Sequence, residues 1–227
     1  MQVLCKEVES KMNTTAKSQE ELIQEIVKNV MEQLNQYNEL KIPIGVSNRH
    51  VHLSRKDLDQ LFGEGYELTK KSDLAQPGQY AANETVVVRG PKGEFKKVRI
   101  LGPVRPESQV EISLTDGFQL GVKAPIKESG HLDDTPGVTL IGPKGAVEMP
   151  RGTIVALRHI HMTPQQAASM GLKDKDVVEV ETFGERAGVL GNVLVRVSDK
   201  FALEMHVDID EANACSLRNK DYVVIKK

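Results

Sequence analysis

The chain has 227 residues, 39% hydrophobic and 27% charged, with a net charge of −2. This length can hold one large domain or two small ones with real cores. The small net charge excludes an overall basic field for nucleic acid, and no apolar run approaches the roughly 20 residues that a membrane span needs. We therefore expect a soluble protein that binds neither nucleic acid nor membranes.

The N-terminal residues predict a separate helix. Residues 1–17 are polar and lack the apolar core of a secretory signal, and Ser18-Gln19-Glu20-Glu21 has the form of a capping box. Apolar residues then follow at the spacing of an amphipathic helix: Leu22, Ile23, Ile26, Val27, Val30, Met31 and Leu34. A polar linker is expected at 35–41. The helix could pack on the body's own core or bind a groove on a partner, and its pattern alone does not decide.

From Ile42 onward the sequence indicates β-structure. Short runs of Val, Ile and Leu are broken by Gly and Pro. Two expected hairpins share the turn Gly-Pro-Lys-Gly, at 90–93 and at 142–145. Further strands are expected at 104–107, 109–114, 176–181, 191–197, 201–209 and 222–225. We predict a mainly β fold with short helices, built as two duplicated small β-barrel domains, 42–130 and 131–227, between which strands can be exchanged.

A short motif occurs twice in this body. Arg49-His50-Val51-His52 and Arg158-His159-Ile160-His161 both read Arg-His-x-His, and they contain four of the six histidines in the chain. Residues i and i+2 of a strand point to the same face, so each copy aims two imidazoles into one space, as a metal site requires. Two copies in matching contexts favour metal binding. The alternative is an old duplication in which the histidines bond only to the backbone.

The residues after each motif predict a short helix. Ser54 is placed to cap a helix over 55–62, and Thr163 to cap another that begins at Pro164 and ends before Gly171. The expected unit is therefore a strand with two histidines followed by a helix, and it is made twice.

A fifth histidine extends the metal hypothesis. His206 lies in an apparent strand beside Glu204, whereas His131 lies in a loop rich in Gly, Asp and Pro and is expected to be exposed. A catalytic zinc uses three protein ligands, so five histidines fit two metals that share a carboxylate better than one metal. The residues leave that carboxylate open between Glu111 and Glu204.

Such a site would attract anions. Two zinc ions and one carboxylate leave about three positive charges, and Arg49, Arg105 or Arg158 could hold a phosphate through paired N–H donors. This favours metal-assisted hydrolysis or transfer to or from an anionic group. The residues alone do not separate a hydrolase from a phosphate-dependent transferase, and a metal-stabilised scaffold is the non-enzymatic alternative.

From Ile42 to the C-terminus the sequence resembles the PduL family of phosphate propanoyltransferases, the phosphotransacylases of bacterial microcompartments. The segments that carry the resemblance are 43–54, 102–105, 156–163, 205–208 and 211–213. It implies two β-barrel domains around a site with two zinc ions. It also implies the reversible exchange of the CoA of an acyl-CoA, expected to be propanoyl-CoA, for inorganic phosphate. A metal-dependent thioesterase or other hydrolase remains the alternative.

The resemblance also implies roles for individual residues. The zinc ligands would be His50, His52, Glu111, His159, His161 and His206. Arg105 would hold phosphate and is the expected catalytic residue. The residues facing CoA would be Val46, Ser47, Asn48, Lys92, Arg99 and Asn213. The N-terminal helix would be an encapsulation peptide that docks the enzyme, expected as a homodimer, onto shell or core proteins in the microcompartment lumen.

Overall fold

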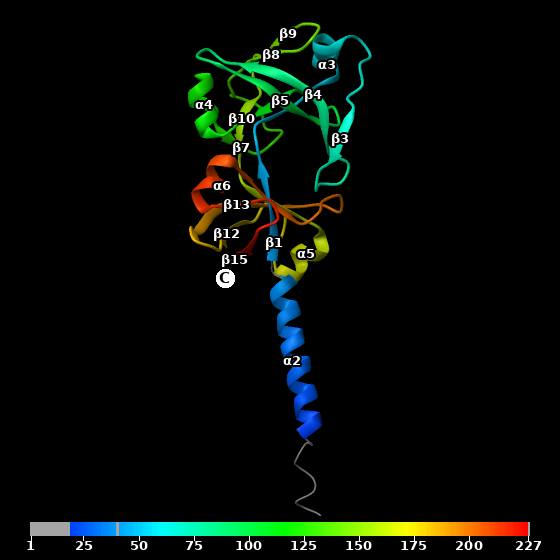
Figure 1. Ribbon diagram of the computed structural model, residues 1–227, viewed down its shortest axis with the longest axis vertical. Helices are drawn as coiled ribbons and strands as arrows, with labels where there is room; N and C mark the ends of the chain where they lie inside the picture. The colour runs from blue at the N-terminus through cyan, green and yellow to red at the C-terminus, as the bar shows by residue number, and fades with distance from the viewer. Residues whose placement is uncertain (1–18, 40, 227) are drawn as a thin grey trace, which may run out of the picture. The chain divides into compact units, whose positions relative to one another are not determined.

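The structure is a computed structural model that describes residues 19–39 and 41–226. The chain divides into two compact units, Met1–Lys41 and Ile42–Lys227. The first contains helix α2 (Gln19–Glu39), which runs past the linker start expected at residue 35 (Figure 1). Its expected N-cap, Ser18, lies outside the described residues. No described helix is long and apolar enough to cross a membrane.

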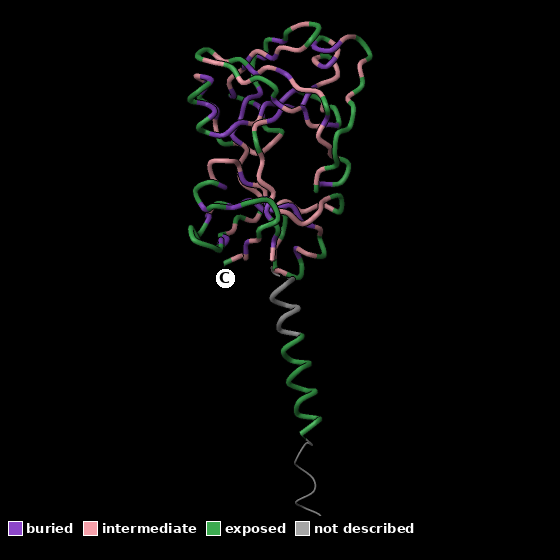
Figure 2. The backbone as a smooth tube through the Cα atoms, viewed as in Figure 1, coloured by how far each residue is buried: buried purple, intermediate pink, exposed green. Residues whose placement is uncertain are grey.

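The apolar residues of α2 are exposed along its described part (Figure 2). Each is about half accessible, between 46% for Val30 and 59% for Ile23. The set consists of Leu22, Ile23, Ile26, Val27, Val30 and Met31.

One of the two sheets in the second unit is a closed barrel. Its strands are, in order, β1 (Lys41–Ser47), β14 (Glu204–Asp208), β11 (His159–Met162), β13 (Val189–Val197), β12 (Val177–Glu181) and β15 (Tyr222–Ile225). Its core contains Ile44, Ile160 and Met205, each no more than 1% exposed.

The other sheet has nine strands in the described part of the chain and stays open. Its order is β7 (Ile126–Lys127), β10 (Thr153–Ala156), β6 (Gln109–Glu111), β2 (His50–His52), β5 (Glu94–Gly102), β4 (Tyr80–Arg89), β8 (Thr139–Ile141) and β9 (Ala146–Glu148), with β3 (Lys70–Asp73) beside β4. The expected pair of barrels is therefore one barrel and one open sheet, because the short edge strands β7 and β9 do not pair with each other.

The two sheets are interleaved in sequence. β1 comes early in the chain but pairs in parallel with β14 of the barrel. Conversely, β8, β9 and β10 come after residue 131 and belong to the nine-stranded sheet. The expected boundary between residues 130 and 131 therefore does not separate the two sheets.

Four strands run directly into short helices whose first turns are capped alike. β2 leads into α3 (Arg55–Phe62) and β11 into α5 (Pro164–Met170), both as predicted. The sequence interpretation missed α4 (Leu114–Leu120) after β6 and α6 (Ile209–Cys215) after β14, where it extended strands to residues 114 and 209. The N-cap residues are Ser54, Ser113, Thr163 and Asp208, and each accepts a hydrogen bond from the backbone N–H of the third helical residue.

The segment 104–107, expected as a strand, forms none. It contributes only an isolated bridge between Arg105 and Ser54, in which Arg105 N donates to Leu53 O over 2.9 Å. This bridge places Arg105 at the end of β2, beside the first Arg-His-x-His motif.

Candidate metal centres

The expected alternation brings each histidine pair together. In β2, Val51 is fully buried in the core of the nine-stranded sheet, and the His50 and His52 rings beside it have centroids 5.0 Å apart. In β11, Ile160 fills the barrel core, and the His159 and His161 rings have centroids 4.6 Å apart. Both pairs therefore point away from a core, as the period of two predicts.

The first triad consists of His50, His52 and Glu111. β2 and β6 are antiparallel, and His50 stands opposite Glu111. Nε2 of His50 lies 3.4 Å from Glu111 Oε2, and Nε2 of His52 lies 3.8 Å from Oε1. One ligand atom from each residue lies within 4.8 Å of the others, which is a spacing that a single metal ion can bridge.

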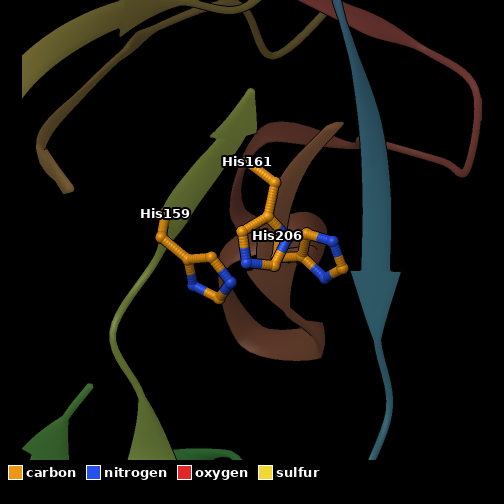
Figure 3. A group of neighbouring side chains, drawn as sticks. All are labelled: His159, His161 and His206. Atoms are coloured by element: carbon orange, nitrogen blue, oxygen red, sulfur yellow. The ribbon is translucent and has the colours of Figure 1, made fainter. Parts of the chain in front are cut away.

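The second triad consists of His159, His161 and His206. β11 and β14 are antiparallel, and His206 stands opposite His159, with the two rings stacked and their centroids 5.0 Å apart. Figure 3 shows the three side chains of this triad as neighbours. His206 also lies 5.0 Å from His161 between ring centroids. The ligand atoms again lie within 4.8 Å of one another. The structure thus brings His206 to the second pair and Glu111 to the first.

All six of these residues line one cavity of about 610 Å³. The triads therefore face a common space, although they come from different sheets. Glu111 of the first triad also acts on His159 of the second, because its charge works to raise the pKa of that imidazole.

Backbone hydrogen bonds orient one histidine of each pair in the same way. Nδ1 of His50 donates to Asn48 O over 2.8 Å, and Nδ1 of His159 donates to Leu157 O over 2.7 Å. A carbonyl can only accept, so Nδ1 carries the proton and Nε2 is left as a free electron pair. Backbone bonding thus occurs in both motifs and leaves a metal-binding nitrogen open.

Charges in the first triad are coupled. Burial works to lower the pKa of His50, but the neighbouring Glu111 carboxylate outweighs it and raises that pKa. Burial works to raise the pKa of Glu111, but His50 and then His52 hold it well below its usual range. Burial, followed by the charge of His50, lowers the pKa of His52 well below normal. A carboxylate oxygen with two imidazole nitrogens is a donor set that suits zinc.

The second triad is electrically different. Burial, and then the charge of His206, lowers the pKa of His159 to about 4. Burial, and then the charge of His159, lowers the pKa of His161 to about 2. Both ring nitrogens of His161 are buried without a hydrogen-bond partner among the described residues. Such unpaired groups are costly unless a ligand satisfies them.

Two of the three candidate phosphate-binding arginines are engaged elsewhere. Arg49 forms a two-pronged ion pair with Asp116, with Nη2–Oδ1 2.6 Å and Nε–Oδ2 3.0 Å. Nη1 of Arg158 lies 3.0 Å from Glu211 Oε1. Asp116 and Glu211 are the third residues of α4 and α6, so each motif arginine fastens its strand to the neighbouring capped helix.

Arg105 is the arginine that remains for an anion. It lines the cavity, and among the described side chains only Ser129 Oγ accepts from its guanidinium, over 3.2 Å. Burial lowers the pKa of Arg105, although a guanidinium stays charged at physiological pH.

The expected CoA-facing residues divide into two groups. Val46, Ser47, Asn48 and Arg99 line the cavity. Lys92 and Asn213 are not among its lining residues. Lys92 lies in the β4–β5 turn, where its backbone N–H donates to Leu120 O, and Asn213 is exposed on α6.

The cavity also contains residues that sequence reasoning missed. Gln76, Ser129, Arg196 and Phe201 all line it. Arg196 is brought in because β13 runs beside β11 with Arg196 opposite His161, and the Phe201 ring stacks on His161 with centroids 4.2 Å apart. These residues lie in loops or in a pairing of distant strands, so no local motif identifies them. His131 is exposed, as expected.

Fold and site together define a protein with two candidate metal centres facing one cavity that is also lined by a partly buried arginine, Arg105. The family model for phosphate propanoyltransferase matches residues 43–218. The chain therefore belongs to the phosphate propanoyltransferase family, which confirms the resemblance found in the sequence.

Relatives that carry the name phosphate propanoyltransferase cover most of the chain. The relative from Thermotoga maritima is 58% identical over 185 residues, which is 81% of this chain and 88% of the relative. That from Rhodopseudomonas palustris is 57% identical over 187 residues, 82% of this chain and 83% of the relative. That from Salmonella typhimurium is 48% identical over 200 residues, 88% and 93% of the two chains.

Proposed function

We propose that this protein is a zinc-dependent phosphate acyltransferase. It converts an acyl-CoA and phosphate into an acyl phosphate and CoA, and catalyses the reverse reaction. The expected acyl-CoA is propanoyl-CoA. The observation that carries the proposal is the convergence of both triads and Arg105 on one cavity, in a chain of the phosphate propanoyltransferase family.

The residues fit two zinc ions. Imidazole nitrogens and a carboxylate oxygen are ordinary zinc ligands, and three protein ligands per ion leave a position open for substrate. The unpaired nitrogens of His161 and the free Nε2 atoms of His50 and His159 support the same assignment. One ion would be held by His50, His52 and Glu111, and the other by His159, His161 and His206. When bound, they supply Lewis-acid polarisation of substrate oxygen and stabilise a thiolate.

The chain's own groups bind and orient the anion. The Arg105 guanidinium faces the cavity from the end of β2 and can hold phosphate oxygens through parallel N–H donors. A phosphate oxygen then attacks the thioester carbonyl carbon, the carbon–sulfur bond breaks, and CoA leaves as a thiolate. Val46, Ser47, Asn48 and Arg99 line the same cavity and are the proposed CoA contacts. Lys92 and Asn213 remain proposed contacts for parts of CoA that extend beyond the cavity.

A single assay tests this function. Purified, zinc-loaded protein should release CoA from propanoyl-CoA only when inorganic phosphate is present, and acyl phosphate should accumulate in equal amount. Release of CoA at the same rate without phosphate would identify a metal-dependent thioesterase or other hydrolase instead. A metal content near two zinc ions per chain, with no release under any condition, would leave the scaffold interpretation.

We also propose a docking role for α2. The helix exposes an apolar series over residues 22–31 and belongs to its own compact unit. It would bind a groove on a shell or core protein and thereby place the enzyme, as a homodimer, in the lumen of a bacterial microcompartment. The two β-structured halves, 42–130 and 131–227, would then act as one catalytic body.

A further inference from the structure

A second acidic side chain, Glu204, touches the second triad without being one of its members. It stands opposite His161 in the pairing of β11 with β14. Its Oε2 lies 2.8 Å from Nε2 of His206, two residues further along the same strand. The Glu204 side chain is 14% exposed and lines the cavity. A largely buried carboxylate in such a place needs partners that hold it.

The backbone leaves a space shaped for this carboxylate. Gly45 of β1 pairs in register with His206, and a Cβ added at Gly45 would lie 2.8 Å from the carboxyl carbon of Glu204. Any larger residue at position 45 must therefore push the Glu204 carboxylate away from its present place. Since the group in the way is the end of a flexible side chain, the backbone itself need not move.

A buried glutamine from the other sheet holds the same carboxylate. Gln76, in the loop between β3 and β4, is 3% exposed. Its amide exchanges two hydrogen bonds with the backbone of Ala202, Nε2 to O over 3.0 Å and N to Oε1 over 3.2 Å. Nε2 also donates to Glu204 Oε2 over 3.5 Å. Gln76 thus anchors both the β13–β14 loop and the acid beside His206.

The first triad contains a comparable arrangement. Gln109 stands opposite His52 as Glu204 stands opposite His161, and its amide donates to Glu111 Oε1 over 2.5 Å. In each centre a glutamine amide thus fixes a carboxylate. The difference is that Glu111 is itself a member of the first triad. Glu204 is not a member of the second triad but contacts one of its histidines, His206.

We propose that Glu204, held from the nine-stranded sheet by Gln76, is a positioning residue that fixes the ring of His206 for the second metal centre. The proposal rests on the proposed function only in assuming that the second triad binds a metal. The contact is an ion pair rather than a hydrogen bond, because Nε2 of His206 is a buried nitrogen without a hydrogen-bond partner among the described residues. A carboxylate beside a ligand histidine orients its ring, and loss of such a partner typically costs 10- to 100-fold in metal affinity. The two sheets thereby cooperate in building one centre.

The experiment measures metal affinity separately from catalysis. Metal-free protein is titrated with Zn²⁺ in competition with a chromophoric chelator, and with Co²⁺ while its visible absorption is recorded. In Glu204→Gln, Gln76→Ala and Gly45→Ala, one of the two equivalents of Zn²⁺, that of the second triad, should bind at least tenfold more weakly. Its Co²⁺ band should change, while the other equivalent keeps the affinity and spectrum of the unmodified chain.

Gln79→Ala is the matched control. Gln79 lies in the same loop and lines the same cavity, but among the described residues its hydrogen bonds are made by its backbone alone. This variant should bind both equivalents normally. Gly45→Ala tests the geometry with the carboxylate still present, so a general effect of lost charge is excluded.

Three results would overturn the positioning role. Unchanged affinity of both equivalents in Glu204→Gln would show that the carboxylate does nothing for the centre. Equal weakening of both would show a general loss of stability. Complete loss of one equivalent would make Glu204 a ligand. Phosphate-dependent CoA release by the unmodified chain tests the proposed function by itself. The positioning role of Glu204 and the proposed function can therefore fail independently.

Discussion

Glu111 lies opposite His50 in the antiparallel pair of β2 and β6. His206 takes the corresponding place opposite His159 in the pair of β11 and β14. The two centres therefore share one frame, a strand with two histidines beside a strand that provides a third group. They differ by one negative charge, because the first triad contains a carboxylate and the second contains three imidazoles.

This difference predicts that a substitution in one triad weakens metal binding there and not in the other triad. Glu111→Gln removes the carboxylate of the first triad, so its metal should bind at least tenfold more weakly, while the metal on the three histidines is retained. Because both triads line the same cavity, phosphate-dependent CoA release should fall about 100-fold or more. Elemental analysis after dialysis, together with the CoA assay, checks both expectations.

Glu107→Gln is the control for this substitution. Glu107 pairs with Arg151 on the surface, so its loss should leave metal content and activity unchanged. Two retained metals and full activity in Glu111→Gln would contradict the assignment of Glu111 as a ligand.

The parts of the site that the sequence predicted are those that local geometry determines. His50 and His52 share a face because side chains on a strand alternate, and α3 begins after Ser54 because a hydroxyl can cap a first turn. The helices α4 and α6 follow the same rule, with capping boxes at Ser113 and Asp208. That signal was present in the sequence, but strands were extended through it.

Other features depend on which distant segments pair. β1 lies beside β14 rather than in the sheet that contains β2, and no residue in 41–47 indicates this choice. Arg49 and Arg158 appeared suited to phosphate, yet their partners Asp116 and Glu211 lie 67 and 53 residues away. Gln76 reaches Glu204 across 128 residues. Such contacts come from tertiary structure, which local patterns do not specify.

Arg105→Lys should raise the KM for phosphate about tenfold or more. Lysine keeps the charge but loses the planar fork that binds two oxygens together, and a charge-assisted hydrogen bond contributes about 1.5–3 kcal/mol. Initial rates at varied phosphate, with acyl-CoA saturating, measure the effect. The KM for acyl-CoA should change little. Arg151→Lys, in an exposed ion pair, serves as the control and should alter neither constant.

Asp116→Asn should lower the free energy of unfolding without changing the KM for phosphate. Asp116 is 2% exposed and forms the ion pair with Arg49, whose side chain is 33% exposed. Because Arg49 is partly solvated, the loss in unfolding free energy should be about 1–3 kcal/mol rather than the larger cost of a fully buried pair. Urea unfolding of the zinc-loaded protein measures it. A raised KM for phosphate with unchanged stability would instead give Arg49 a role in substrate binding.

Deletion of residues 1–40 should leave catalysis intact. The catalytic body is a compact unit that begins at Ile42, and every residue of both triads lies within it. The truncated chain should retain phosphate-dependent CoA release and fail to copurify with microcompartment shells that capture the full chain. Lost catalysis would show that the helix contributes to the fold of the body, and retained capture would exclude α2 as the docking element.

Metal-free protein should lose stability as the pH falls from about 6.5 to about 4. The pKa of His159 drops from 6.5 to about 4 on folding, chiefly through burial, and that of His161 drops to about 2. In this interval the two histidines bind protons in the unfolded chain but not in the folded chain. Their contribution to the free energy of unfolding is therefore fully present above pH 6.5 and declines below it. The 2.5-unit shift of His159 corresponds to about 3 kcal/mol. His50 works in the opposite direction because its pKa is raised, but the lowered pKa values of His159 and His161 should dominate.

Thermal unfolding in the presence of a chelator should therefore give a Tm that falls as the pH falls. The fall should be smaller in His159→Gln, and in His131→Gln, whose ring is exposed, it should equal that of the unmodified chain. A Tm that stays level over this range would mean that the imidazoles are hydrated in the metal-free protein.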